Sequence, residues 1–311
     1  MKRLIYIVVV TYNGIQWIDK CLGSIDFSTY QVVVVDNNST DQTVNFISKN
    51  YPSITLLAQD KNLGFGQANN LGISHALQQG AEYVFLLNQD AYLYPDTITN
   101  LIEVYKTHPE YGIISPIHLN GEGTKLDKTF SFFVDYNHHE YFYFDAIKKQ
   151  LEPVYDIPFV NAAAWLLPKT TLLNIGGFDP LFFHYGEDNN YCQRVLFHGY
   201  KIGVATNAFV KHDREIRKHV RQTHNLLFSE KYFKEKELAY KIKYADLNFE
   251  DAENAFVKEL KKIERMSLKF LFKLKIKHYK GYKKLGDILK SVYAKSVNSK
   301  ELNQKKNSNY I

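Results

Sequence analysis

The chain has 311 residues, 45% of them hydrophobic and 23% charged, and a formal net charge of +6. This length allows one large domain or two small ones with a sizeable core. No run of about eighteen apolar residues occurs, which excludes a membrane-spanning helix.

The N-terminus and the cysteines bear on the compartment. The apolar run Ile5 to Val10 is too short for a secretory signal and leads directly into the polar Thr11. Cys21 and Cys192 lie in different segments and lack metal-ligand spacing. We therefore expect a cytoplasmic protein with two buried, reduced thiols.

The charge is unevenly placed along the chain. Residues 1–211 hold 14 Lys+Arg and 20 Asp+Glu, a balance of −6, while residues 212–311 hold 25 and 13, a balance of +12. Such an asymmetry indicates an anionic partner for the C-terminal part, either a membrane surface or a nucleic acid.

Apolar runs alternate with helical patterns up to residue 95. The runs are bounded by polar residues, as expected of strands buried on both faces of a parallel sheet. This alternation predicts an α/β fold with a doubly wound, mostly parallel sheet flanked by helices. The predicted strands are Leu4–Val10, Val32–Val35, Ile54–Leu57 and Tyr83–Leu87, and the predicted helices lie at 15–23, around Val44–Ile47, and up to Gln79.

The pattern is less regular after residue 95. We expect a catalytic domain over residues 1–220, with a nucleotide-binding half (1–95) and an acceptor-binding half (96–220). A basic helical extension follows at 221–311, with a disordered end from about residue 296. Within the second half we expect helices at 97–107 and 189–197, strands at 111–117 and 201–205, and an aromatic hairpin within 121–150.

Two carboxylates stand where ligands bind in open α/β sheets, just beyond the carboxyl ends of strands. Asp36 could hydrogen-bond a ribose or a base edge, and Asp90 could meet a cation on a phosphate; alternatively, Asp90 only caps the turn before Pro95. Neither a G-x-G-x-x-G nor a G-x-x-x-x-G-K-[ST] loop is present, which disfavours a dehydrogenase and excludes a P-loop kinase. Without such a loop, the acidic residues 1–211 could bind a diphosphate only if a divalent metal, Mg²⁺ or Mn²⁺, neutralised its charge.

Three further residues have two interpretations each. Glu187 and Asp188 precede a helical pattern, so they are either first-turn partners of the helix dipole or, for one of them, a general base in an aromatic pocket. His212 is either a metal or phosphate ligand, or an ordinary surface residue.

Five stretches in order resemble the signature of family 2 glycosyltransferases, which have the GT-A fold, and specifically their rhamnosyltransferase-like branch. The resemblance covers roughly residues 4 to 212. The stretches are Val9–Asn13, Val34–Asp41, Asn62–Gly66 with Asn69–Gly72, Leu86–Asp90, and Gly176–Asp179 through Glu187–Asp188.

The resemblance implies a role for each site residue. Asp188 would be the catalytic base, and Asp90 would hold the metal with help from His212. Trp165, Ala162 and Glu187 would face the acceptor. The nucleotide sugar would be bound by Thr11, Asn13, Asp36, Asn38, Asn62, Gly64, Asn88 and Gln89. Two positions depart from the family: Asn88 stands where Asp-x-Asp commonly begins with a carboxylate, and Asn190 where an acidic residue usually follows the base.

The implied function is an inverting glycosyltransferase in cell-surface polysaccharide synthesis. The donor would be dTDP-rhamnose or a UDP-hexose, and the acceptor a glycan or a lipid-linked sugar. The alternative is a catalytically weak or inactive nucleotide- or glycan-binding protein with the same fold, an interpretation that Asn88 favours.

The basic extension offers a second inference. Residues 263–276 carry apolar and basic side chains at helical spacing, as in a helix that lies on an anionic bilayer. The equal alternative is a helix that packs its apolar stripe on the body. We expect peripheral contact with the inner membrane surface and no nucleic-acid partner, because the extension has few arginines and no recognition motif.

Overall fold

The computed structural model describes residues 4–214 and 227–311. These residues form two compact units: one comprises the chain up to residue 215 together with 306–311, and the other comprises 216–305. No helix in the described ranges is long and apolar enough to cross a bilayer.

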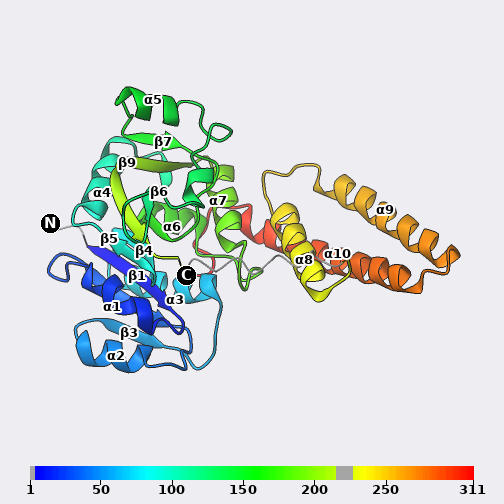
Figure 1. Ribbon diagram of the computed structural model, residues 1–311, viewed down its shortest axis with the longest axis horizontal. Coiled ribbons are helices and arrows are strands. Elements are labelled where there is room, and N and C mark those ends of the chain that lie inside the picture. The colour runs from blue at the N-terminus through cyan, green and yellow to red at the C-terminus, as the bar shows by residue number, and fades with distance from the viewer. Residues whose placement is uncertain (1–3, 215–226) are drawn as a thin grey trace. The chain divides into compact units, whose positions relative to one another are not determined.

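The first unit is built on a sheet that has nine strands among the described residues (Figure 1). The strand order is β3-β2-β1-β4-β8-β6-β9-β5, with β7 paired to β9. The first four strands are parallel, whereas β8 runs antiparallel to both β4 and β6. The bounds are β1 (Ile5–Thr11), β2 (Gln31–Asp36), β3 (Thr55–Ala58), β4 (Tyr83–Asn88), β5 (Ala91–Leu93), β6 (Tyr111–Asn120), β7 (Val154–Asp156), β8 (Ala164–Pro168) and β9 (Lys201–His212).

Helices cover both faces of this sheet. Successive side chains of a strand point to opposite faces, so Val8 of β1 belongs to one core and Ile7 to the other. The first core includes residues of α3, α6 and α7, and the second includes residues of α1, α2 and α4. The expected α/β fold is therefore confirmed. The helices are α1 (Ile15–Gly23), α2 (Thr43–Asn50), α3 (Phe65–Gln78), α4 (Thr97–Thr107), α5 (Phe142–Lys148), α6 (Lys169–Ile175) and α7 (Glu187–Phe197).

The predicted hairpin within 121–150 is wrong. This segment contains a 3₁₀ turn at Phe130–Phe132 and helix α5. Phe130 and Phe142 both enter the same core, and the Asp127 carboxylate accepts a hydrogen bond from the Phe130 amide at 2.8 Å. Local side-chain-to-backbone bonds of this kind compete with strand pairing.

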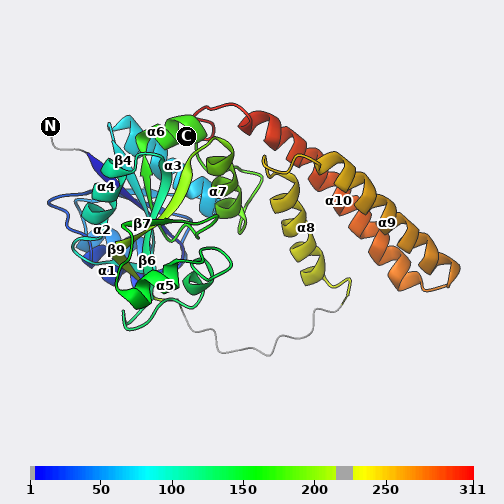
Figure 2. The same cartoon turned by 90° about the horizontal axis from the view of Figure 1, so that it is seen from above.

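The second unit consists of α8 (Glu230–Tyr244), α9 (Ala252–Phe272) and α10 (Ile276–Asn303), which share a core of their own. In both views α9 and α10 run antiparallel as a helical hairpin (Figures 1 and 2). The expected single helix over 263–276 is wrong, because α9 ends at Phe272 and a turn precedes α10.

The predicted disorder from residue 296 is also wrong. Helix α10 continues to Asn303, whose side-chain amide donates to the Ser299 carbonyl at 2.8 Å, and both residues are buried. Residues 306–311 return to the first unit, where Gly177 donates to the Asn309 carbonyl at 2.8 Å. Polar composition misled the sequence argument here, since the Asn303 amide and the Asn309 carbonyl find hydrogen-bond partners inside the fold.

Candidate active site

The ends of β1 and β2 are tied together by a buried carboxylate. Thr11 Oγ1 donates to Asp36 Oδ1 at 2.9 Å, and the amide of Ser39 donates to Asp36 Oδ2 at 2.8 Å. Thr11 and Asp36 are both buried. Their carboxylate–hydroxyl bond fixes the two strand ends at the edge of the sheet where ligands bind in such folds.

The loops after these strands are shaped by two asparagines in left-handed backbone conformation. Asn13 has φ 47° and Asn38 has φ 68°. Asn13 also joins the two loops, because its amide donates to Ser39 Oγ at 2.9 Å and its side-chain carbonyl accepts from the Thr40 amide at 2.8 Å. Asparagine tolerates this conformation better than most residues.

A third loop, between β3 and α3, is attached to the second by amide side chains. Asn37 Nδ2 donates to Asn62 Oδ1 at 3.0 Å, and Asn62 Oδ1 also accepts from the Gly64 amide at 2.8 Å. Gly64 has φ +81° and precedes the first residue of α3. Its backbone lies so close to the Phe183 carbonyl that an added Cβ would stand 2.0 Å from that oxygen.

Gly64→Ala is expected to weaken donor binding by about tenfold or more, because left-handed strain costs roughly 1–3 kcal/mol and the Phe183 loop must also shift. The measurement is the donor KM together with the melting temperature. Gly80→Ala is the matched control, since Gly80 has a similar φ of +85° but open space around its Cβ position. An unchanged KM in Gly64→Ala would contradict the assignment of this loop to the donor.

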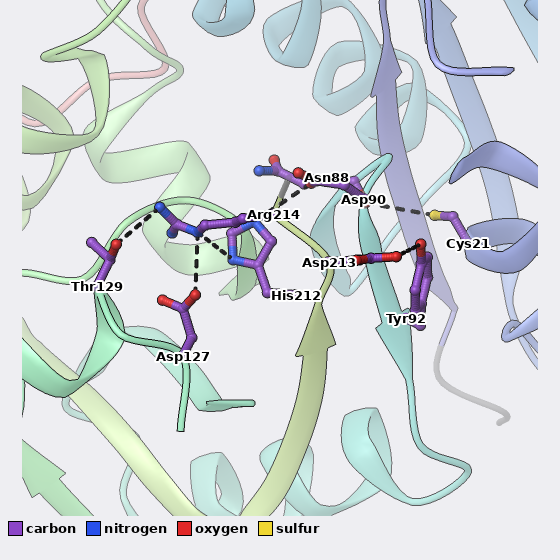
Figure 3. Close-up of polar contacts among 9 residues, drawn as sticks. All are labelled: Cys21, Asn88, Asp90, Tyr92, Asp127, Thr129, His212, Asp213 and Arg214. Carbon is purple, nitrogen blue, oxygen red and sulfur yellow. Dashed lines mark hydrogen bonds and ion pairs between the residues drawn. The ribbon is translucent and has the colours of Figure 1, made fainter. Parts of the chain in front are cut away.

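The polar triplet Asn88, Gln89 and Asp90 begins at the last residue of β4 and lies beside these loops. Gln89 Oε1 accepts a hydrogen bond from the Tyr12 amide at 2.9 Å, which joins the end of β4 to the loop after β1. Asp90 lies where β5 pairs with β9, so that Ala91 is opposite His212. His212 Nε2 then stands 3.4 Å from Asp90 Oδ1. Figure 3 shows these two side chains next to Arg214.

Arg214 was missed by the sequence argument and completes this group. Its Nε donates to His212 Nδ1 at 3.3 Å and lies 3.5 Å from Asp127 Oδ2, while Nη1 donates to Thr129 Oγ1 at 3.3 Å (Figure 3). The buried Nη2 has no hydrogen-bond partner among the described residues. A sequence signal existed, because Arg214 follows His212 by two positions at the end of a strand.

Asp188 stands in the first turn of α7, whose N-cap is Gly186 in left-handed conformation. Its carboxylate accepts hydrogen bonds from the backbone amides of Asn189, at 2.8 Å, and Ala162. Burial raises the pKa of Asp188 above its ordinary value of 3.8, while the charge of Arg214 acts in the opposite direction. Arg214 therefore acts electrostatically on Asp188 while contacting His212, the partner of Asp90.

The neighbouring Glu187 is buried, and burial raises its pKa from 4.5 to about 7. Its Oε2 has no hydrogen-bond partner among the described residues. Both adjacent carboxylates lie in the first turn of α7, as the helix-dipole interpretation expected. However, the burial of Glu187 places it beneath the site rather than on a surface open to an acceptor.

Glu187→Gln is expected to raise the free energy of unfolding at about pH 8 by up to about 3 kcal/mol, with little change at about pH 4. The folded state holds this proton up to about pH 7, whereas the unfolded chain releases it near pH 4.5. Wild-type stability therefore falls as pH rises between these values. Thermal melts at both pH values test this, with the exposed Glu122→Gln as control; equal shifts in the two variants would contradict it.

Two residues expected to contact the acceptor, Trp165 and Ala162, do not lie on the surface. Trp165 is fully buried in β8, packed in the core with Phe178 and Tyr191, because β8 is a central strand of the sheet. Ala162 is also buried, and its backbone amide contacts Asp188 instead. The segment therefore positions the carboxylate of Asp188 and does not offer a platform for a sugar.

The described residues contain no group of three or more His, Cys, Asp or Glu side chains that could hold a metal ion. The pair Asp90 and His212 still fits a substrate-dependent ion, because Mg²⁺ is usually bound by one or two carboxylates plus substrate phosphates. While Nδ1 of His212 accepts from Arg214, a neutral ring carries its proton on Nε2, facing Asp90. In this tautomer His212 orients Asp90, which leaves Asp90 as the first candidate ligand.

Comparison with known proteins identifies the family. The family model described as Glycosyl transferase family 2 matches residues 6–169, more than half of the chain. The chain belongs to this family. The predicted resemblance is confirmed, and with it the expectation of a glycosyltransferase enzyme.

Two curated relatives are rhamnosyltransferases by name. An N-acetylglucosaminyl-diphospho-decaprenol L-rhamnosyltransferase of Mycobacterium tuberculosis is 23% identical over 240 residues, which cover 69% of this chain and 77% of the relative. The dTDP-rhamnosyl transferase RfbF of Shigella flexneri is 24% identical over 223 residues, which cover 68% of this chain and 70% of the relative. This family 2 glycosyltransferase is thus similar to two rhamnosyltransferases over about two thirds of its length.

A solved structure supports the fold of this family 2 member. TarS residues 1–349 of S. aureus, in complex with UDP, superposes with a TM-score of 0.53 at 17% identity and covers 95% of this chain and 91% of TarS. This likeness confirms the expected GT-A fold. The family match ends at residue 169, so the roles of Asp188, His212 and Arg214 depend on the geometry described above.

Proposed function

We propose that this glycosyltransferase moves a sugar from a nucleoside diphosphate to a hydroxyl of a glycan or lipid-linked acceptor, inverting the anomeric centre. dTDP-rhamnose is the first candidate donor and a UDP-hexose the second. The names of the two curated relatives support a rhamnosyl donor, and one of them supports a polyprenyl-diphosphate-linked acceptor. The observation that carries the proposal is that Arg214, whose buried Nη2 has no partner among the described residues, contacts the His212 that pairs with Asp90.

The loops at the carboxyl ends of β1, β2 and β4 would hold the nucleotide. Asp36 fixes the loops through Thr11 and Ser39, so it supports the nucleotide site mainly by keeping them in place. Nη2 of Arg214, which lacks a partner in the part of the chain that the structure describes, could donate to a phosphate oxygen. The loop residues assigned to the donor are Thr11, Asn13, Asp36, Asn38, Asn62, Gly64, Asn88 and Gln89.

The transfer would be a single in-line displacement. Asp188 takes the proton of the acceptor hydroxyl, the hydroxyl oxygen forms a bond to the anomeric carbon, and the bond from that carbon to the phosphate oxygen breaks. The electron pair of the broken bond leaves on the nucleoside diphosphate. Arg214 lies close enough to the Asp90–His212 pair to stabilise the charge that develops there.

A bound Mg²⁺ or Mn²⁺ would neutralise the departing diphosphate as a Lewis acid, held by Asp90. The raised pKa of Asp188 suits its task, because a carboxylate that binds its proton more tightly is a stronger base. The amides of Ala162 and Asn189 keep that carboxylate in one orientation.

A donor screen tests the proposal. The full chain is incubated with dTDP-rhamnose, UDP-glucose or UDP-N-acetylglucosamine, with and without Mn²⁺, and both melting temperature and nucleotide release are measured. A true donor binds only the folded state and must raise the melting temperature. We expect the largest Mn²⁺-dependent shift with dTDP-rhamnose and release of dTDP. Binding without release in the presence of any acceptor would instead support the inactive binding protein.

We also propose that the enzyme works at a membrane surface. The C-terminal part carries the charge balance of +12, and one relative acts by name on a decaprenol-linked sugar. The apolar and basic helix expected at 263–276 is interrupted by the turn between α9 and α10, so the contact needs a different geometry.

A further inference from the structure

The turn between α9 and α10 exposes a run of apolar and basic side chains that alternate from Phe272 to Lys277. We call residues 271–277 the hairpin tip; their sequence is Leu-Phe-Lys-Leu-Lys-Ile-Lys, and all seven are exposed. Phe272 is 83% exposed and Leu274 is 82% exposed, the two highest values among the large apolar side chains of the described residues. Large apolar groups that gather at one exposed point mark an interaction site.

The hairpin tip is ordered by the chain beneath it. Leu274 has φ 52°, and the turn is closed by hydrogen bonds from Leu274 N to Leu271 O and from Lys275 N to Phe270 O, both at 2.9 Å. Phe270 stacks on the rings of His278 and Tyr282 at centroid distances of 4.8 and 5.6 Å. A leucine in a left-handed helix terminus, where glycine is usual, costs roughly 1 kcal/mol.

The aromatic contacts of Phe270 therefore secure the turn while Phe272 and Leu274 remain uncovered within the unit. An apolar side chain at this strained position gains nothing from the unit's own core, since that core is formed by other residues. A partner outside the unit would explain why leucine stands there.

Charge decides which partner fits. Between Glu264 and Asp287 the sequence has eight basic residues and no acidic one. These are Arg265, Lys269, Lys273, Lys275, Lys277, Lys280, Lys283 and Lys284. Apolar side chains surrounded by lysines match the interface of an anionic bilayer, where the chains reach the acyl region and the ammonium groups reach the headgroups.

We propose that the hairpin tip inserts into the interface of an anionic membrane, with Phe272 and Leu274 below the headgroups and the surrounding lysines at their level. The inference deepens the membrane contact proposed above and names its contact surface, but it does not depend on the transfer chemistry. It differs from a helix lying flat on the bilayer, because the contact is one end of an ordered hairpin.

The first experiment measures binding of the full chain to vesicles of phosphatidylcholine, with or without phosphatidylglycerol, by co-sedimentation. We expect binding only with phosphatidylglycerol. Phe272→Ser with Leu274→Ser should lower the partition coefficient at least about tenfold. Leu173→Ser, which replaces an apolar side chain that is 48% exposed in the first unit, is the matched control and should leave binding unchanged.

Replacing Lys273, Lys275 and Lys277 by Gln should lower binding by about fivefold for each charge removed, and the loss should shrink as salt is raised. The matched control replaces three exposed lysines of the first unit, Lys49, Lys125 and Lys128, by Gln. Equal losses in the two triple variants would show that net charge alone attracts the vesicle, and would contradict a specific contact.

The Phe272→Trp variant tests insertion, because tryptophan fluorescence depends on the polarity of its surroundings. We expect its added fluorescence to shift to shorter wavelength with phosphatidylglycerol vesicles and to be quenched by brominated acyl chains, over the background of Trp17 and Trp165. Emission that stays as in water would overturn insertion. A wild-type dimer in solution that dissociates in Phe272→Ser would show that a second copy covers the hairpin tip, and would also overturn the proposal.

Failure of this inference can be distinguished from failure of the proposed function. The vesicle assays contain no donor, and nucleotide release is measured separately with a soluble acceptor. Variants of the hairpin tip should keep the nucleotide release of the wild type, because no tip residue belongs to the candidate active site.

Discussion

Asp188→Asn is expected to lower kcat by about 10²–10⁴-fold while leaving donor binding unchanged, because an amide cannot take the acceptor's proton. The substitution keeps the shape of the side chain, and its carbonyl oxygen can still accept from the amides of Ala162 and Asn189. Steady-state kinetics with the donor from the screen, together with the thermal shift that this donor produces, provide the measurement.

The pH profile separates a base from a residue that only supports the fold. Asp188 acts only when deprotonated, and its pKa is raised above 3.8. Wild-type kcat/KM should therefore fall as pH decreases through a value above the ordinary range of an aspartate, and the residual activity of Asp188→Asn should lack this limb. The control is Asp96→Asn, an exposed aspartate at the start of α4, which should keep the wild-type profile. An unchanged limb in Asp188→Asn would assign the base elsewhere.

Asp90→Asn should lower kcat/KM by about a hundredfold or more and abolish the effect of Mn²⁺ on donor binding, because it removes the only carboxylate of the triplet. The side chain is 24% exposed, so an ion on a bound diphosphate can reach it. Mn²⁺ titration of the thermal shift given by the nucleoside diphosphate measures the effect directly.

The Asn88→Asp variant adds a carboxylate to the triplet, whereas Asp90→Asn removes one. It restores a carboxylate at the first position of the triplet, and two carboxylates should bind Mn²⁺ more tightly than one. We therefore expect a lower Mn²⁺ concentration at half-maximal shift for Asn88→Asp and no Mn²⁺-dependent shift for Asp90→Asn. Equal Mn²⁺ dependence in both variants and the wild type would show that Asp90 does not hold the metal.

The nucleotide-binding half could be predicted from sequence because its signals are local. Apolar runs buried on both faces end abruptly at polar residues, and β1, β2 and β4 end at Thr11, Asp36 and Asn88. Parallel strands bring those ends to one edge of the sheet. Because their strand ends lie at one edge, Thr11 and Asp36 are close enough to form a hydrogen bond.

The rest of the site depends on pairing between distant segments. The antiparallel pairing of β5 with β9 brings His212 to Asp90, and the position of Arg214 follows from it. No local pattern encodes this pairing. Trp165 was misplaced for a related reason: a tryptophan after small residues fits a binding surface and a core strand equally well, and only the pairing of β8 with β4 decides between them.

A crystal structure with Mn²⁺ and an intact, non-hydrolysable analogue of the donor would test the central claim most directly. The account predicts the ion within about 2.2 Å of an Asp90 oxygen and of the diphosphate. It further predicts that the Asp188 carboxylate faces the anomeric carbon from the side opposite to the diphosphate. A diphosphate bound away from Asp90 and Arg214, or a sugar whose reactive face is turned from Asp188, would contradict it.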